Sequence, residues 1–236
     1  MRQVLTIGGR QFRSYFNGPV AYIVICIVML TLGFFFWKTF FLFSRASARE
    51  MFRWLGLIMV FALPALTMGL LAEEKRTGTI ELLITMPVTE AQVILGKFIG
   101  VLGLYAVILA LTVFYPISVS TLGDLDWGPV LSGYLGLLLQ GSAVLAIGLM
   151  ASSWTSNQLI ALFVALTLSV FFWVLDKFLA ILPTNAASTL EWLSFDHHFQ
   201  SMARGVIDLR DVLFFVSVAV FALALAFRAL ESRRWS

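Results

Sequence analysis

Few residues of this chain have types and spacings that could support chemistry, and the adjacent pair His197–His198 is the first to consider. Neighbouring residues of a helix point about 100° apart, so two adjacent histidines do not converge on one ion. No cysteine or carboxylate lies at a zinc-typical spacing from them. The sequence therefore predicts no metal site here, and Asp196 is interpreted as a first-turn partner of the helix dipole.

Motifs for nucleotide or hydrolytic chemistry are also missing from the sequence. The phosphate-binding pattern Gly-x-x-x-x-Gly-Lys-Ser/Thr does not occur, because Gly96–Lys97 lacks both the preceding glycine and a strand before it. No serine–histidine–aspartate set and no zincin motif is present. We therefore expect no catalytic residue, metal ligand or cofactor-binding residue in this chain.

The charged run at 73–87 is the first segment with a distinctive pattern. Gly78 permits a turn, Thr79 can cap a helix, and Glu81 then lies in the first turn, where the helix dipole favours an acid. Pro87 ends the helix a few residues later. The pattern predicts a helix of about two turns, parallel to the membrane surface. Its apolar face comprises Leu82, Leu83 and Met86.

This run is either a charged connector or a docking helix for a groove in a cytoplasmic partner. The ordered set 78–83, Pro87 and Gly96–Lys97 resembles the permeases of the second ABC exporter class, and in particular their gliding-motility-associated branch. The resemblance covers essentially the whole chain. It implies that the run is a coupling helix that contacts a separate ATPase subunit, which would bind ATP and Mg²⁺. The matching positions are Glu74, Arg76, Gly78, Thr79, Glu81, Leu82, Leu83 and Pro87.

A second patterned segment lies in the loop at 183–211. Its apolar residues are spaced as on one face of a helix that Ser194 can cap and Gly205 can end. Those apolar residues are Phe195, Phe199, Met202 and Val206. We expect this face to dip into the outer leaflet. The segment is similar to the re-entrant outer helices of the same family, which form an exit gate; a plain interfacial anchor is the alternative.

The elements that position these segments are membrane-spanning helices. The chain has 236 residues, of which 60% are hydrophobic and 12% charged. Soluble proteins carry about 25% charged residues, and apolar blocks of about 18 or more are candidate spans. The sequence therefore predicts an all-α polytopic membrane protein with a single transmembrane domain over 1–236. The six expected spans are 20–43, 51–72 with a kink at Pro64, 91–118 with a capping box at Thr89–Gln92, 130–152, 157–182 and 212–230.

Residues 1–19 are predicted to form an interfacial helix and a turn, because three arginines interrupt an apolar pattern at helical spacing. With both termini in the cytoplasm, the inner segments carry nine Lys and Arg residues and the outer segments seven. The resemblance implies the same orientation, with 73–90 as the cytoplasmic coupling loop. A bacterial inner membrane is the expected location.

Inside the spans, Gln140 is the most conspicuous polar residue. It is expected to face another helix, either as a hydrogen-bonding contact between helices or as part of the substrate route. Asp176 and Lys177 are interpreted as interfacial. The stripes Gly96-x-x-x-Gly100 and Ser132-x-x-x-Gly136 predict close helix packing against this chain or another one.

The favoured interpretation is the permease subunit of an ATP-driven exporter, paired with a second copy or a similar chain and with ABC ATPase subunits. A secondary transporter is the first rival, although no ionisable residue lies at mid-span and no inverted repeat is visible. The second rival is a non-transporting scaffold of an ATPase-driven envelope or motility complex. Membrane lipid is an expected contact, an additional envelope protein is left open, and nucleic acid is not expected.

Overall fold

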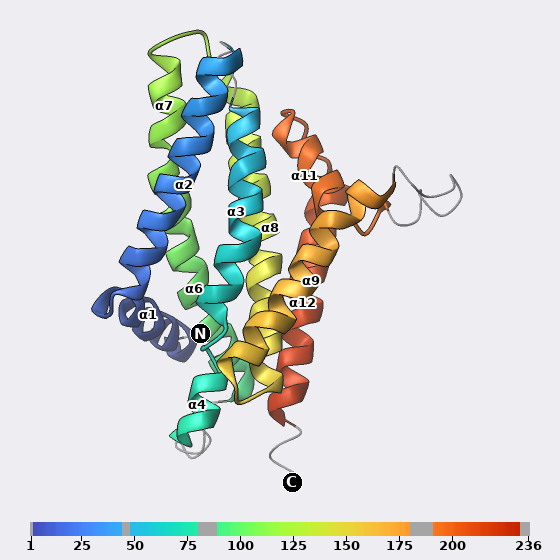
Figure 1. The fold of residues 1–236 in the computed structure, drawn as a ribbon. Coiled ribbons are helices and arrows are strands. Elements are labelled where there is room, and N and C mark those ends of the chain that lie inside the picture. Colours follow the sequence, from blue (N-terminus) through green and yellow to red (C-terminus); the bar gives the residue numbers. More distant parts are fainter. Residues whose placement is uncertain (1, 44–47, 80–88, 180–190, 232–236) are drawn as a thin grey trace.

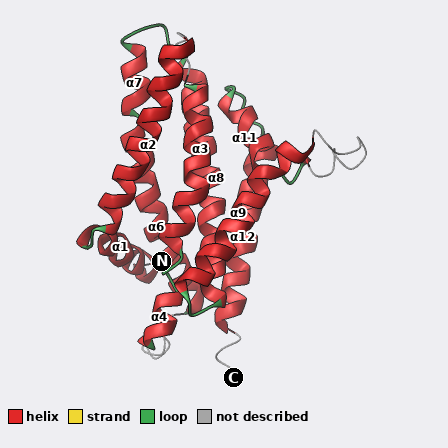
Figure 2. Ribbon diagram, in the orientation of Figure 1, coloured by secondary structure: helices red, strands yellow, loops and turns green. Residues whose placement is uncertain are grey.

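A computed structural model of the protein describes residues 2–43, 48–79, 89–179 and 191–231, and every regular element in these ranges is a helix (Figures 1 and 2). Six helical stretches are long and apolar enough to cross a membrane, which confirms the predicted all-α polytopic architecture. The helices are α1 (Arg2–Asn17), α2 (Val20–Phe43), α3 (Arg49–Thr67), α4 (Ala72–Thr77), α6 (Glu90–Thr112), α7 (Phe114–Ser120), α8 (Trp127–Trp154), α9 (Gln158–Leu179), α11 (Phe195–Ala203) and α12 (Leu209–Glu231).

Helix boundaries follow local capping chemistry more closely than apolar runs. The capping box at the start of α6 is present, with the Thr89 hydroxyl accepting from the Gln92 amide and the Gln92 side chain accepting from the Thr89 amide. Helix α8 begins at Trp127, three residues earlier than predicted, because Asp126 caps it through the Gly128 amide. Pro129 falls in the first turn, where proline is tolerated. Helix α3 continues past Pro64 to Thr67, so the helix breaks after the proline rather than at it.

Helix α8 forms the centre of the bundle. It contacts α3, α4, α6, α9, α11 and α12, and most of its residues are buried, whereas only a minority of the residues of α2, α9 and α12 are. The closest approaches occur at α8 glycines. A methyl group at Gly141 would overlap the Tyr105 ring of α6, whose hydroxyl donates a 2.6 Å hydrogen bond to the Leu137 carbonyl. Only glycine allows the two helices to pack at this distance.

Helix α1 lies across the bundle and packs on the first half of α6 (Figure 1). The neighbour predicted for the stripe Gly96-x-x-x-Gly100 is therefore α1 of the same chain. A methyl group at Gly96 would lie 2.7 Å from the Ile7 side chain, and one at Gly100 would lie 2.8 Å from the Gly8 carbonyl oxygen. The second predicted stripe, Ser132-x-x-x-Gly136, packs on α11.

The helices place the two patterned segments at opposite ends of the bundle. The start of α1, helix α4 and the C-terminal end of α12 lie at one end, which we call the α4 end (Figure 1). Helix α7 and helix α11 lie toward the other end, which we call the α11 end. The alternating directions of the six spans produce this separation.

Candidate functional site

Helix α4 projects from the bundle at the α4 end and carries the first four charged residues of the 73–87 run, which are residues 73–76 (Figure 1). Glu73 and Arg76 are exposed, while the base of the helix at Ala72 is buried. Gly78 ends the helix with φ of 73°, a left-handed conformation that glycine adopts without strain. The predicted turn at Gly78 is therefore confirmed.

One buried serine of α8, Ser152, binds several backbone groups of the chain between α3 and α4. The Ser152 hydroxyl accepts hydrogen bonds from the amides of Leu71 and Ala72, both at 3.0 Å. The same hydroxyl donates to the carbonyl of Met68, also at 3.0 Å. Residues 68–71 are not helical, so these backbone groups lack the usual partners inside a helix. Ser152 supplies the missing partners.

Lys97 of α6 also contacts the segment that joins α3 to α4. Its ammonium group donates to the Leu70 carbonyl at 2.7 Å and forms a 2.7 Å ion pair with Oε1 of Glu74. The Lys97 side chain is 4% exposed and that of Glu74 is 27% exposed. A buried ammonium is stable only when charged and polar groups compensate it, so Lys97 requires both partners.

Two further contacts complete the α4 end. The Lys75 ammonium donates to the carbonyl of Ser153 on α8. The Tyr15 hydroxyl of α1 donates to the Leu66 carbonyl at 2.9 Å, and burial raises the pKa of this phenol far above its usual value. Helices α6 and α8 therefore bind the segment that joins α3 to α4, and α1 binds the last turn of α3 just before it.

The structure brings together Glu74, Arg76, Gly78 and Thr79 of the predicted coupling residues. Thr79 donates to the Glu74 carbonyl at 3.4 Å and lies 3.0 Å from the Thr77 hydroxyl. The remaining predicted coupling residues, Glu81, Leu82, Leu83 and Pro87, lie outside the described residues. The contacts of Ser152, Tyr15 and Lys97 were not predicted from the sequence, where Lys97 entered only as part of the pair Gly96–Lys97. A lysine followed by a long apolar run was the available signal for a buried charge.

At the α11 end, Ser194 caps α11 through the His197 amide, as predicted. Phe195, Phe199 and Met202 share one face, but protein rather than lipid covers it. The Phe195 ring stacks on Phe172 of α9 at 5.0 Å and lies 5.6 Å from Phe215 of α12. The expected contact with the outer leaflet is therefore wrong for this face. Periodicity identifies an apolar face but cannot identify what covers it.

The end of α11 also differs from its prediction. Val206 is 61% exposed and lies beyond the helix, which ends at Ala203. Gly205 adopts φ of 98°, which fits its predicted place near the helix end. The Ser132 hydroxyl of α8 donates to the Met202 carbonyl at 2.7 Å, so the last turn of α11 is bound to the central helix.

Polar contacts tie α11 to both of its other neighbours. Lys177 at the end of α9 forms ion pairs with Asp196 at 2.6 Å and with Asp176 at 3.1 Å. Asp196 therefore has a lysine partner in addition to its first-turn position. On the α12 side, Nδ1 of His198 lies 2.7 Å from Oδ1 of Asp211.

Residues 46–227 match the sequence model of a family described as "ABC-2 family transporter protein". The matched part begins just before α3 and includes both the α4 end and α11. The chain belongs to the ABC-2 transporter family. A search of curated proteins found no match.

Membership of the ABC-2 family assigns the chain a role as a membrane permease of an ABC transporter and implies association with an ABC ATPase. The match supports the family resemblance noted from the sequence at the level of the ABC-2 family.

In this ABC-2 permease, Gln140 lies at the crossing of α8 with α3. Its side chain is buried, and its Oε1 atom has no hydrogen-bond partner among the described residues. A methyl group at Gly56 of α3 would lie 3.7 Å from this oxygen. Gln140 therefore faces another helix, as expected. It does not line the groove between α9 and α12 that is described next.

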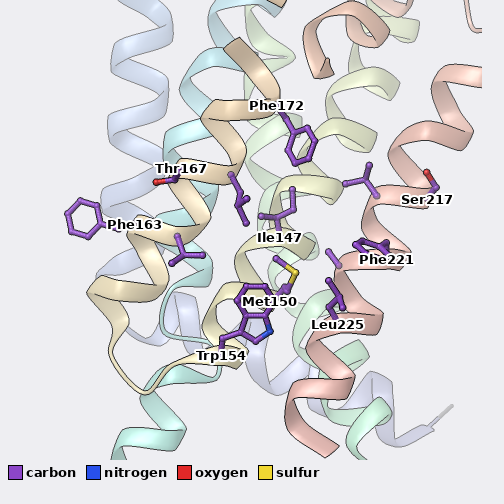
Figure 3. Close-up of a pocket in the computed structure, with 13 residues that line it drawn as sticks. Ile147, Met150, Trp154, Phe163, Thr167, Phe172, Ser217, Phe221 and Leu225 are labelled. Atoms are coloured by element: carbon purple, nitrogen blue, oxygen red, sulfur yellow. The ribbon is translucent and has the colours of Figure 1, made fainter. Parts of the chain in front are cut away.

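A groove of the ABC-2 permease opens between α9 and α12, with α8 as its floor (Figure 3). It has a volume of about 920 Å³. Met150 and Trp154 of α8 lie between the two walls in Figure 3. Thr167 and Ser217 supply the hydroxyl groups of a lining that is otherwise apolar or aromatic. The lining suits acyl chains or the apolar side chains of another helix.

Proposed function

We propose that this ABC-2 permease is the membrane-spanning subunit of an ATP-driven exporter and that a separate ATPase chain docks at the α4 end. The observation that carries the proposal is the projecting helix α4, whose tip is charged and exposed while its base is bound by α6 and α8. Docking needs an accessible tip, and transmission of movement to the spans needs a rigid connection between that tip and the spans. Family membership supports the same partner.

The proposal places the α4 end and both termini in the cytoplasm of a cell whose inner membrane holds the permease. Three arginines of α1, Arg2, Arg10 and Arg13, are exposed at this end, and an excess of basic residues on the cytoplasmic side is the usual arrangement. In this orientation α1 lies along the inner face of the membrane. The α11 end then faces the outside.

Energy would reach the permease through differential binding. ATP and Mg²⁺ bind to the partner, and closure of the partner favours the permease state to which it binds more tightly. The 73–90 loop, including Glu81, Leu82, Leu83 and Pro87, carries this contact in the proposal. A second permease copy or a similar chain completes the transporter.

Phe195 and Phe199 are proposed to act as an outer gate. They pack α11 onto α8, α9 and α12, so a displacement of α11 would separate aromatic rings that stack at the α11 end. Gln140 is the proposed polar contact on the route, since its oxygen is buried without a partner among the described residues. The apolar character of the surrounding spans suits an amphiphilic or lipid-linked cargo.

Purification of the chain from its native membrane in mild detergent, followed by an assay of ATPase activity, tests this function. The wild-type chain and Asp124→Lys, an exposed acid-to-base change in the loop before α8, should co-purify with an ATPase. Glu81→Lys should lose the ATPase or uncouple its activity. A clean preparation without ATPase in several detergents would favour a secondary transporter. A captured ATPase with no transport in vesicles would favour the scaffold.

A further inference from the structure

Two buried side chains join the base of α4 to the rest of the bundle. Ser152 of α8 binds three backbone groups of residues 68–72, and Lys97 of α6 binds the Leu70 carbonyl and Glu74. These two residues come from different spans and meet at one interruption of the second span. They are the polar side chains of α6 and α8 that contact this interruption within the described part of the chain.

We infer that Lys97 and Ser152 are positioning residues that transmit movement of α4 to α6 and α8. The inference rests on the proposed function, because it concerns how a docked ATPase acts on the spans. Neither residue is expected to touch the ATPase, since both side chains are almost completely buried. They would act by linking the movement of α4 to the movement of α6 and α8.

The interruption provides the place where α4 can pivot. Helix α3 is fixed just before it, because a methyl group at Gly148 of α8 would overlap Thr67. A turn at residues 68–71 follows, with Leu71 at φ of −120°, and α4 begins at Ala72. Within this turn the Leu70 amide bonds to the Thr67 carbonyl, and the Leu71 and Ala72 amides bond to Ser152 rather than to the backbone, so it bends at lower cost than a continuous helix. Movement of α4 is therefore concentrated at the residues that Lys97 and Ser152 hold.

The same contacts prevent α4 from moving alone. Separation of Glu74 from Lys97 would leave a buried ammonium without its carboxylate, which is strongly unfavourable. Withdrawal of residues 71–72 from Ser152 would leave two amides unpaired, and each buried unpaired group carries a desolvation penalty. Rotation of α4 together with α6 and α8 keeps every contact. Coupled movement is thus the favourable course.

Glu74 has a second feature that fits this role. Its Oε1 atom binds Lys97, whereas its Oε2 atom is buried and has no hydrogen-bond partner among the described residues. A shift of α4 that brings a hydrogen-bond donor to Oε2 would stabilise a second arrangement of the contacts between α4, α6 and α8. Two arrangements that differ by a few contacts are what a two-state coupling element requires.

The experiment uses the co-purified complex and a cysteine reporter at the α11 end. Cys26 is the single cysteine of the chain and is exposed, so it is replaced in Cys26→Ser before Arg204→Cys is introduced. The rate at which a membrane-impermeant maleimide labels Arg204→Cys is measured with ATP and with ADP. Arg204 is exposed and lies at the end of α11.

In the reporter background we expect an ATP-dependent change in labelling rate. Lys97→Met should capture as much ATPase as the reporter alone yet lose this change, and Lys97→Arg, which keeps the charge and donors, should retain it. Ser152→Ala should also lose it, and this variant carries the test if Lys97→Met does not fold. Ser142→Ala, which removes a hydroxyl that donates to the Leu139 carbonyl within α8, is the matched control and should respond normally.

Two results would overturn the inference while leaving the proposed function intact. One is a normal ATP response in Lys97→Met and in Ser152→Ala. The other is capture of an ATPase by the reporter chain with no ATP-dependent change at Arg204→Cys. Failure of the reporter chain to capture any ATPase would instead overturn the proposed function, and the inference would fall with it.

Discussion

His198 and Asp211 form a buried contact between α11 and α12, with Nδ1 of His198 lying 2.7 Å from Oδ1 of Asp211. The second ring nitrogen of His198 lies 3.0 Å from the Trp192 carbonyl. Both ring nitrogens therefore lie within hydrogen-bonding distance of oxygen atoms. The ring also stacks on Phe214 at 4.1 Å. This pair fixes one side of α11.

The first prediction concerns the loss of this histidine. His198→Phe preserves the stacking on Phe214 but leaves the Asp211 carboxylate buried without its partner, which costs about 3–5 kcal/mol. We expect a clear fall in the midpoint of thermal unfolding in detergent. The double change His198→Phe with Asp211→Asn removes the charge and should recover most of the loss.

His197→Phe is the matched control for this prediction. His197 is 41% exposed and lies 3.1 Å from Glu191, a solvent-exposed pair worth about 0–1 kcal/mol. If the two histidine changes lower the unfolding midpoint equally, the buried contact with Asp211 does not contribute more to stability than the exposed pair.

The second prediction concerns the unpaired oxygen of Gln140. Gly56→Ser would place a hydroxyl donor within reach of Oε1, because a methyl group at Gly56 lies 3.7 Å from it and meets no closer atom. A satisfied hydrogen bond adds about 0.5–1.5 kcal/mol. We expect Gly56→Ser to raise the unfolding midpoint above that of Gly56→Ala, which adds the same carbon without the hydroxyl.

The same pair of changes in a Gln140→Leu background isolates the contact. There the serine has no amide oxygen to bind, so its advantage over alanine should vanish. An advantage that persists would show that the serine binds another group. Transport by Gln140→Leu should be measured alongside, because a stable but inactive variant would support a role of Gln140 on the route.

The third prediction concerns docking of α1. Gly100→Leu inserts a side chain where even a methyl group would lie 2.7 Å from Cβ of Gln11, so α1 must separate from α6. Trypsin should then cleave several-fold faster at Arg10 and Arg13. Gly9→Ala, which meets no atom within 4 Å, is the control and should leave cleavage unchanged or slower. Unchanged cleavage of Gly100→Leu would show that α1 is held by other contacts.

Local features of this fold could be predicted from the sequence because their causes lie within a few residues. The caps at Thr89 and Ser194 and the turn at Gly78 depend on a side chain or a backbone angle at one position. Apolar runs long enough to cross a bilayer similarly identify the spans. These features need no knowledge of tertiary packing.

The contacts of the candidate site could not be predicted because they join distant parts of the chain. Lys97 binds a carbonyl at Leu70, and Ser152 binds amides at residues 71–72, and no local pattern specifies a backbone partner in another helix. The glycine stripe at 96–100 predicted close packing but not that α1 is the neighbour. The apolar face of α11 was visible, whereas its cover of aromatic rings from α9 and α12 was not.

The packing of α1 on α6 also constrains the order of assembly during synthesis. Gly8 contacts a surface that includes Gly100, so roughly 90 residues must be added before the partner surface exists. At about 5–20 residues per second, this interval lasts on the order of 5–20 s. In the proposed orientation, α1 is thus left at the bilayer surface while α2 and α3 insert ahead of its partner. Until then its amphipathic character, with Leu5 exposed and arginines beside it, is what retains it there.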